Sequence, residues 1–303
     1  MPQGGAFIKL SKLLSLGLVV STLITSLTLS ASAITPSHQA PVVYSPEFPD
    51  AYIVTEVTPE TQNLDGTSGS LGSVSATVFV EESYDIVNGE LTVTDSRLLS
   101  ENEVKAIGEE NFLDLNDAPI PQKTATASRG KLTITFAGTH SLNNGGVSCT
   151  LTGTAGWARP DIIGSNSNNP TPGEDFIGVT WFGGFTALKT SISGTDNMHQ
   201  SLKIYSADSV PNGGRVWSFE ESIVHPKYST YAADMNLSLT LSKNKLTGDG
   251  NTAEAVLKYI HTYSKVNGSI SITPGTDSAA GSFSLSNTKD QWSITCTIHS
   301  IPY

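Results

Sequence analysis

Apolar and polar residues alternate with a period of two over long parts of the chain, which is the pattern of a half-buried β-strand. The clearest case is residues 235–242, where Met and Leu at odd positions alternate with Asn, Ser and Thr. Because the polar positions are mainly Ser and Thr, the pattern favours an antiparallel sheet with one face on a core and the other in water. The same alternation occurs at residues 74–80, 132–136, 147–152 and 292–299.

Further strands are expected in shorter runs rich in β-branched and aromatic residues. Many short strands with turn residues between them indicate an all-β fold, either an antiparallel β-sandwich or a jelly-roll-like domain. These additional runs are residues 52–57, 176–182, 185–192, 201–206 and 215–223.

Two hairpins can be placed by their turn residues. Asn88-Gly89 predicts a two-residue type I′ turn, which would pair Ile86 with Leu91 and Tyr84 with Val93 on one face. The Asn-Asn-Gly-Gly run at residues 143–146 predicts the turn between the strands at 132–136 and 147–152.

One helix start has a clear signature. Ser100 followed by Glu103 forms a capping box, and Leu99 with Val104 forms a hydrophobic staple. Gly108 predicts an early end, so we expect one short helix.

The segment 253–263 fits two structures. Its apolar residues suit either a helix or a strand, and we choose a strand that turns at Asn267-Gly268 and sets Tyr263 opposite Ile272.

Charge is unevenly distributed along the chain. Residues 34–121 hold 16 acidic residues against Arg97 and Lys105, a net charge of −14, whereas residues 122–303 have a net charge of +1. This asymmetry predicts two units, a small acidic β-rich unit at 51–121 with the helix and a β-sandwich domain at 122–303. A Pro-rich lead-in at 34–50 precedes them. The acidic surface either binds cations or only keeps the protein soluble.

The amino terminus predicts secretion. Lys9 and Lys12 precede an uncharged run from Leu13 to Leu29, and Ala31-Ser32-Ala33 follows in the form that signal peptidase accepts. Residues 1–33 therefore fit a signal peptide, with an uncleaved anchor as the alternative, and the form of the cleavage site indicates a bacterial source. We expect an extracellular protein with no transmembrane segment in its mature chain.

Composition excludes several classes of protein. Charged residues make up 15% of the chain and hydrophobic residues 38%, with two cysteines, which rules out a disordered chain and a disulfide-dense miniprotein. No basic stripe is present that could neutralise phosphates, so nucleic acid is not an expected partner.

Cys149 and Cys296 lie on the apolar faces of their strands, in similar contexts. In an oxidising compartment we expect them to form a disulfide between facing sheets, with two buried free thiols as the alternative.

The stretch 216–221 is the best candidate for a ligand site. Alternation places Trp217, Phe219 and Glu221 on one face, and Trp181 belongs to a second aromatic cluster. An aromatic surface beside a carboxylate is suited to stacking and hydrogen bonding of a sugar. The competing interpretation places these aromatic residues in the core.

Candidate cofactor sites are weak. Asp114, Asn116 and Asp117 resemble the start of a calcium loop, but the rest of that pattern is missing. The six histidines form no zinc motif, so we expect no resident metal.

These observations favour a secreted, non-catalytic binding or surface-associated module with a glycan or protein ligand. The first alternative is a secreted glycoside hydrolase that uses Glu221 with a second carboxylate from Glu174 or Asp175. The second alternative is a pore-forming toxin, which would require loosely held alternating strands such as 235–242. The sequence leaves the oligomeric state open.

Overall fold

The computed structural model describes most of residues 42–302. The undescribed positions within that range are 65, 88–89, 114–121, 124–126, 160–161, 164–172, 221, 225–228, 247–251, 265–267, 277–280 and 287–288. The predicted signal peptide and the candidate calcium residues Asp114, Asn116 and Asp117 lie outside the described residues.

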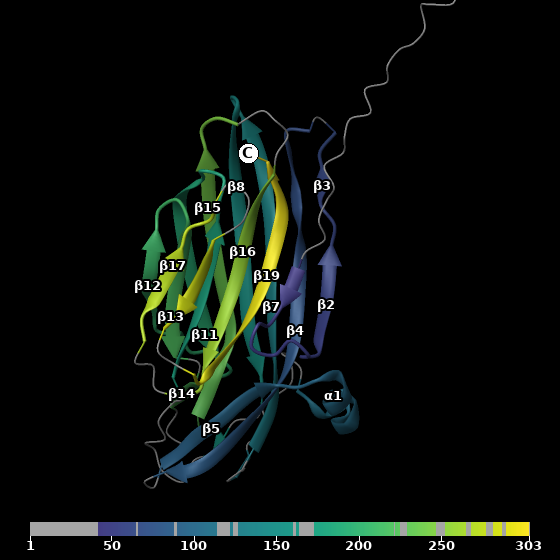
Figure 1. Ribbon diagram of the computed structural model, residues 1–303, viewed down its shortest axis with the longest axis vertical. Helices are drawn as coiled ribbons and strands as arrows, with labels where there is room; N and C mark the ends of the chain where they lie inside the picture. Colours follow the sequence, from purple (N-terminus) through teal and green to yellow (C-terminus); the bar gives the residue numbers. More distant parts are fainter. Residues whose placement is uncertain are drawn as a thin grey trace, which may run out of the picture. The chain divides into compact units, whose positions relative to one another are not determined.

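The fold is an all-β, antiparallel sandwich, as the alternation predicted (Figure 1). One sheet has six strands in the order β1-β19-β16-β10-β13-β12. Their bounds are Val42–Tyr44 (β1), Gln291–Pro302 (β19), Thr252–Thr262 (β16), Glu174–Trp181 (β10), Gly214–Glu220 (β13) and Ile204–Val210 (β12).

The facing sheet is built on β2, β4, β7, β8 and β15, in that order, with β11 beside β15. Short strands extend this sheet, and the separate pair β17-β18 forms a small sheet of its own. The bounds are Ile53–Thr58 (β2), Thr61–Gln62 (β3), Ser68–Val87 (β4), Glu90–Leu98 (β5), Gln122–Lys123 (β6), Ala127–Asn143 (β7), Gly146–Ala158 (β8), Ile162–Ile163 (β9), Thr186–Asp196 (β11), Ser222–Val224 (β14), Ser229–Lys243 (β15), Ile270–Thr273 (β17) and Ser282–Leu285 (β18).

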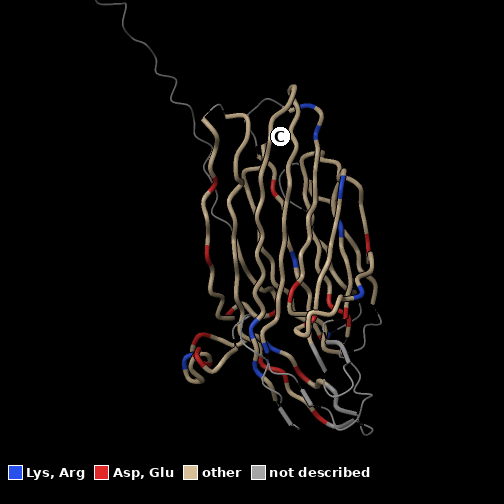
Figure 2. The backbone as a smooth tube through the Cα atoms, turned by 180° about the vertical axis from the view of Figure 1, so that it is seen from behind, with Lys and Arg blue, Asp and Glu red and all other residues tan. Residues whose placement is uncertain are grey.

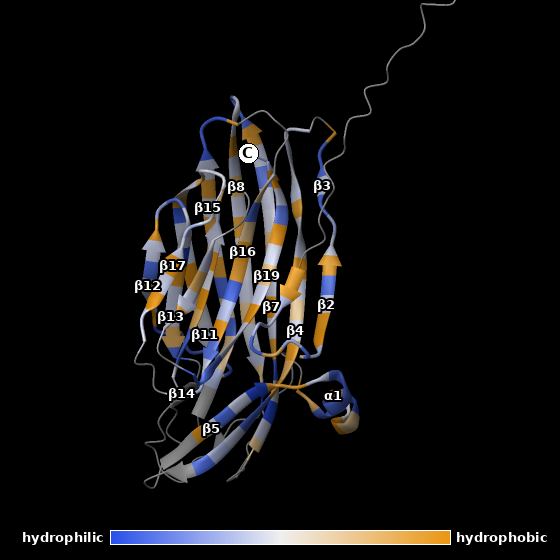
Figure 3. Ribbon diagram, viewed as in Figure 1, coloured by the Kyte–Doolittle hydropathy of each residue, from blue (hydrophilic) through white to orange (hydrophobic). Residues whose placement is uncertain are grey.

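The predicted strands correspond to strands of the sandwich, although their ends differ by up to seven residues. The strand expected at 215–223 is divided between β13 and β14, which belong to different sheets. The strand expected at 201–206 begins only at Ile204. Figure 3 shows hydrophobic and hydrophilic residues alternating along the long strands. On the polar face of β4 and β7, Thr and Ser hydroxyls pair across the strands, with Ser75–Thr135 at 3.0 Å and Thr77–Thr133 at 2.9 Å.

The acidic segment and the following segment do not form separate domains. β4 pairs with β7 from Ser68↔Ser141 to Ser83↔Ala127, across the predicted boundary at residue 122. One apolar core contains residues of both segments, and residues 38–303 form a single compact unit. The physical reason is that the apolar face of β4 is buried only by packing against the other sheet. The uneven charge along the chain reflects a difference in surface composition, and it does not mark a boundary between two cores.

The hairpin predicted at Asn88-Gly89 forms in the expected register, and the turn predicted at residues 143–146 joins β7 to β8. In the β4–β5 hairpin, Ile86 pairs with Leu91 and Tyr84 with Val93. In the β7–β8 hairpin, Asn144 and Gly145 have φ values of 50° and 80°, which a type I′ turn requires at both central positions.

The predicted short helix is also present. Helix α1 spans Glu101–Ile107 and ends at Gly108, with the Ser100 N–H donating to the Glu103 carboxylate at 2.9 Å. A one-turn 3₁₀ helix, Glu109–Asn111, follows it. Leu99 and Val104 share a small apolar cluster with Phe79 and Phe112 on the outer side of β4.

The ambiguous segment 253–263 is a strand, but its expected hairpin is wrong. β16 pairs with β10 and β19 on its two sides, so neither edge is available to β17. β17 pairs with β18 instead, and Ile272 lies opposite Phe283. This small sheet packs on an outer apolar patch of the six-stranded sheet, where Phe176, Val216 and Ile260 lie.

The core between the two sheets is centred on three buried tryptophans. Each indole N–H donates a hydrogen bond, as a buried tryptophan requires. Trp157 donates to the Tyr259 hydroxyl at 2.9 Å, Trp181 to the Phe185 carbonyl at 3.0 Å and Trp292 to the Ser96 hydroxyl at 3.0 Å.

Candidate functional site

The aromatic residues that the sequence offered as a ligand surface lie in the core. Trp181 and Phe219 are fully buried, and Trp217 is only 8% exposed. The exposed aromatic surface is therefore absent at Trp217, Phe219 and Trp181, because the face of β10 and β13 that carries them packs against the other sheet. The competing interpretation, that these side chains fill the core, is the one the structure supports. Glu221 lies outside the described residues.

Cys149 and Cys296 are both buried free thiols in the structure, so the expected disulfide is not formed there. The two residues lie on facing sheets but at different heights. A side chain on Gly153 would meet Leu257, and Leu257 pairs with Cys296 across β16 and β19. Cys149 is four residues from Gly153 along β8, or about 13 Å of strand, whereas a disulfide needs Cα atoms within about 7 Å.

A cluster of buried ionisable groups joins the two sheets near one end of the sandwich. Its members are Glu82 on β4, Arg159 after β8, Asp175 on β10 and His261 on β16, and their side chains are between 0% and 4% exposed. Arg159 donates to Glu82 Oε2 at 2.7 Å. His261 lies between the two carboxylates, with Nε2 3.3 Å from Glu82 Oε1 and Nδ1 3.2 Å from Asp175 Oδ1.

Neighbouring polar groups complete this cluster. The Tyr84 hydroxyl donates to Glu82 Oε2 at 2.6 Å. Asp175 accepts hydrogen bonds from the Thr262 N–H at 2.9 Å and from the Tyr259 hydroxyl. Two cations and two carboxylates give the cluster no net formal charge, which a buried ionic group needs if it is to be tolerated.

The protonation states follow from these contacts. Burial alone would lower the pKa of His261, but the Asp175 and Glu82 carboxylates outweigh it and raise that pKa to about 10. Burial alone would raise the pKa of Glu82, but Arg159 and His261 lower it to about 2. At neutral pH the imidazole is therefore a cation and Glu82 is an anion.

This cluster holds the groups of acid–base catalysis, but it is closed to a substrate. Every member is at least 96% buried, and aromatic side chains cover His261, with Trp292 at 4.9 Å and Trp157 at 5.2 Å between ring centroids. Asp175, considered above as a second hydrolase carboxylate, belongs to this buried group. We therefore assign the cluster a structural role in holding the two sheets together.

Sequence inspection missed this cluster, although a signal for it was present. Glu82, Asp175 and His261 each continue the inward-facing phase of an apolar strand pattern, after Val80, before Ile177 and after Tyr259 respectively. An ionisable residue in an inward phase has to be paired. Three such residues on three strands predict a buried ionic cluster, but only the sheet order shows that the three strand ends meet.

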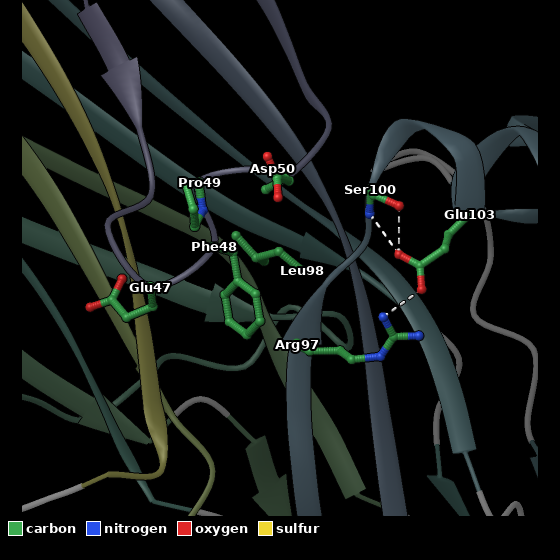
Figure 4. A pocket seen from close by; sticks show the side chains of 9 residues that line it. Glu47, Phe48, Pro49, Asp50, Arg97, Leu98, Ser100 and Glu103 are labelled. Carbon is green, nitrogen blue, oxygen red and sulfur yellow. Dashed lines mark hydrogen bonds and ion pairs between the residues drawn. The ribbon is translucent and has the colours of Figure 1, made fainter.

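A surface hollow of about 230 Å³ lies beside the segment that joins β1 to β2 (Figure 4). Phe48 and Leu98 point toward each other at its centre, and α1 begins at its far side. Its lining residues are Glu47, Phe48, Pro49, Asp50, Ala51, Arg97, Leu98, Ser100 and Glu103.

Some charged side chains of this hollow already have partners among the described residues of the protein, and one does not. Arg97 donates to Glu103 at 2.7 Å and to Glu81 at 2.9 Å, so its charge is already paired. Glu47 accepts from the N–H of Ser293 at 3.0 Å. Asp50 is exposed, and none of the described residues forms a hydrogen bond or ion pair with its carboxylate. The hollow thus combines an apolar floor with one carboxylate available to a ligand.

Within the described part of the chain, no group of three or more His, Cys, Asp or Glu side chains is arranged to hold a metal ion. In the same residues, none of the helices has the length and hydrophobicity needed to span a bilayer.

When the chain is compared with known proteins, similarity is found to solved structures but not to protein families or curated sequences. No protein-family model and no curated protein sequence matches the chain. The collagen adhesin CNA from S. aureus is 10% identical, with 70% of this chain and 88% of that chain covered and a TM-score of 0.22.

Two further structures are similar in the same limited way. The first is described as manganese lipoxygenase of Gaeumannomyces graminis with a partial structure of zonadhesin of Komagataella pastoris; it is 10% identical, covering 87% of this chain and 98% of that chain, with a TM-score of 0.21. The second is the N-terminal domain of the Streptococcus gordonii adhesin Sgo0707, 9% identical, covering 83% and 74%, with a TM-score of 0.14. At these TM-scores the similarity supports no argument about function.

Proposed function

We propose that this chain is a secreted, non-catalytic binding module, and that the hollow between Phe48 and Leu98 binds a sugar residue of an extracellular glycan. The observation that carries the proposal is the hollow itself, because it joins an apolar floor to the available carboxylate of Asp50. Extracellular location rests on the predicted signal peptide at residues 1–33.

The size and chemistry of the hollow favour a small ligand group. Its volume of about 230 Å³ is below the range of about 300–1,000 Å³ for drug-sized ligand pockets, so it suits one sugar ring of a longer chain. The Phe48 ring offers an apolar surface to the face of that sugar ring. The Asp50 carboxylate is an acceptor for its hydroxyl groups.

The two alternative functions receive less support. The hydrolase alternative needed an exposed Trp217 beside its carboxylate, and Trp217 is buried. The toxin alternative needed loosely held strands, whereas residues 235–242 are paired with β8 on one side and β11 on the other.

The test is binding of the secreted chain to an array of cell-wall and host polysaccharides. We expect Asp50→Asn to weaken the binding of the recognised glycan at least fivefold, because the substitution removes the charge from the hydrogen-bond acceptor. Asp95→Asn is the matched control, because Asp95 is also exposed but lies on β5 outside the hollow. Equal effects of the two substitutions, or an array with no bound glycan, would show that the hollow is not a sugar site.

Secretion can be checked in the same preparation. We expect mass spectrometry of the protein in the culture medium to find Ile34 as the first residue. A protein that keeps residues 1–33 and stays with the membrane fraction would instead support the uncleaved anchor.

A further inference from the structure

At the flank formed by β1 and β2, both sheets end in short strands. The six-stranded sheet ends there in β1, which has three residues and pairs with β19 only at Thr295–Thr297. The facing sheet ends in the six-residue strand β2, which pairs with β4 on one side. Among the described residues, no strand pairs with the outer edge of β2, and Figure 1 shows β2 at the border of its sheet.

One residue on β2 shows that this flank lacks cover. Val57 lies opposite Val74, whose side chain is fully buried in the core, so Val57 belongs to the inward face of the sheet. Its side chain is nevertheless 51% exposed. Val54, on the outward face of the same strand, is 37% exposed. A strand with apolar residues exposed on both faces and a free edge is ready to accept another strand.

The charge of the flank indicates what kind of strand it accepts. Residues 42–62 contain Glu47, Asp50, Glu56 and Glu60 and no Lys or Arg. Figure 2 shows charged residues to be sparse along most strands of the sandwich, while this border strand carries acidic positions. By contrast, the opposite border, β11 and β12, carries both Lys189 and Asp208.

The charge of Glu56 distinguishes between two strands that could pair with the edge of β2, a second copy of β2 and a basic strand of another protein. It is exposed near the middle of β2, so an antiparallel second copy of the same edge would bring two glutamates close together. Like charges facing each other across strands are destabilising, whereas a Lys or Arg opposite Glu56 is favourable. The edge therefore disfavours pairing with itself and favours a basic strand.

We propose that the outer edge of β2 binds an extended, basic segment of a partner protein by β-strand addition. Main-chain hydrogen bonds along β2 provide the affinity in this mode of binding. An apolar side chain of the incoming strand covers Val57 on the inward face, and a Lys or Arg on its other face pairs with Glu56. This protein partner is distinct from the glycan of the hollow, and the two sites are tested separately.

The probe is a fluorescein-labelled octapeptide of alternating Lys and Val, acetylated and amidated at its ends, titrated into the full secreted chain. We expect its fluorescence anisotropy to report saturable binding. We expect the corresponding Glu/Val peptide to bind at least tenfold more weakly because it repels Glu56. A Lys/Val peptide with all its amides N-methylated should not bind, since it cannot donate main-chain hydrogen bonds.

Two variants locate the peptide on the protein. We expect Glu56→Lys to reverse the preference, so that the Glu/Val peptide binds more tightly than the Lys/Val peptide. We expect Val57→Lys to weaken the Lys/Val peptide at least tenfold, by placing a like charge on the edge. The matched control is Leu188→Lys on β11, an equally drastic change at a side chain that is 67% exposed on the opposite border, and it should leave binding unchanged.

Three results would overturn the proposal. Equal binding of the Lys/Val and Glu/Val peptides would remove the charge argument, and binding of the N-methylated peptide would exclude strand addition. A dimer in sedimentation that Val57→Lys dissociates would assign the edge to a second copy of the chain. None of these results depends on whether Asp50→Asn changes glycan binding.

Discussion

Replacing His261 by Gln is the sharpest test of the buried ionic cluster. Glutamine keeps a polar side chain of similar length but removes the positive charge between Glu82 and Asp175. Two carboxylates then share Arg159 as their one buried cation. An uncompensated charge in a site that excludes water is costly, so the folded state should lose stability.

The size of the loss follows from the pKa of His261. This pKa rises from 6.5 to about 10 on folding. At about 1.4 kcal/mol per pKa unit, the ionised side chain stabilises the folded protein by about 5 kcal/mol. This value agrees with the loss of about 3–5 kcal/mol that follows removal of one partner from a buried ion pair.

The same shift fixes the direction of the pH dependence. A group whose pKa is raised in the folded state stabilises fully below its unfolded pKa, here 6.5, and loses that contribution as the pH rises toward 10. The native protein should therefore lose about 3 kcal/mol between pH 7 and 9, because the folded state holds one more proton than the unfolded state. The His261→Gln variant should lack this slope.

The assay is urea unfolding of both proteins at several pH values, followed by tryptophan fluorescence. With an m-value of about 3 kcal/mol per molar urea, a loss of about 4 kcal/mol lowers the midpoint by more than about 1 M. His299→Gln is the control, because His299 is paired with the single carboxylate of Glu254 in a less buried place, and its loss should cost at most about 1 kcal/mol.

Two outcomes would refute this reasoning. A His261→Gln variant within about 1 kcal/mol of the native protein at pH 7 would mean that the imidazole is not a buried cation. A native protein with constant stability from pH 7 to 9 would mean that its pKa is not raised.

Three further predictions concern other parts of the fold. The pKa of Glu82 is lowered from 4.5 to about 2, so the free energy of unfolding of the native protein should fall by about 3 kcal/mol as the pH falls from 4.5 toward 2. A Glu82→Gln variant should lack this dependence on acid pH, and parallel melting-temperature profiles of the two proteins from pH 6 to 3 would contradict the prediction. Burial raises the pKa of the Cys149 and Cys296 thiols to about 12, so neither thiol should react with Ellman's reagent at pH 8 until the protein unfolds. Rapid labelling of the native protein would show instead that the thiols are accessible. Gly145 has a φ of 80° with open space around it, so Gly145→Ala should cost about 1 kcal/mol through backbone strain alone, and an unchanged urea midpoint would count against the turn.

Local patterns in the sequence were sufficient to predict the long strands, the helix and two of the connections. The short strands β3, β6, β9 and β18 were not predicted, and neither was β1, which lies within the Pro-rich lead-in expected at residues 34–50. Period-two alternation marks the long strands because successive side chains of a strand point to opposite faces. Asn88-Gly89 predicted the register of the β4–β5 hairpin, since a two-residue turn allows one alignment of its strands, whereas the hairpin expected at Asn267-Gly268 does not form. The Ser100 and Glu103 pair located the helix, because a capping box acts within four residues.

Predictions that depended on distant residues were less successful. β17 was expected beside β16, but sheet order decides which edges are free, and β10 and β19 occupy both edges of β16. The local sequence around Trp217 fits a surface or a core equally well, and packing of the second sheet against this face of β13 decides for the core.

The candidate sites were decided by tertiary structure. The hollow joins residues 47–51 to the end of β5 and the start of α1, and no local pattern relates these segments. Val57 is inward-facing by its alternation, yet its side chain is 51% exposed on the edge strand of its sheet. The sequence by itself determined which face of each strand is apolar, because that property is local. Which strands meet, and where a face is left uncovered, depends on the packing of whole sheets.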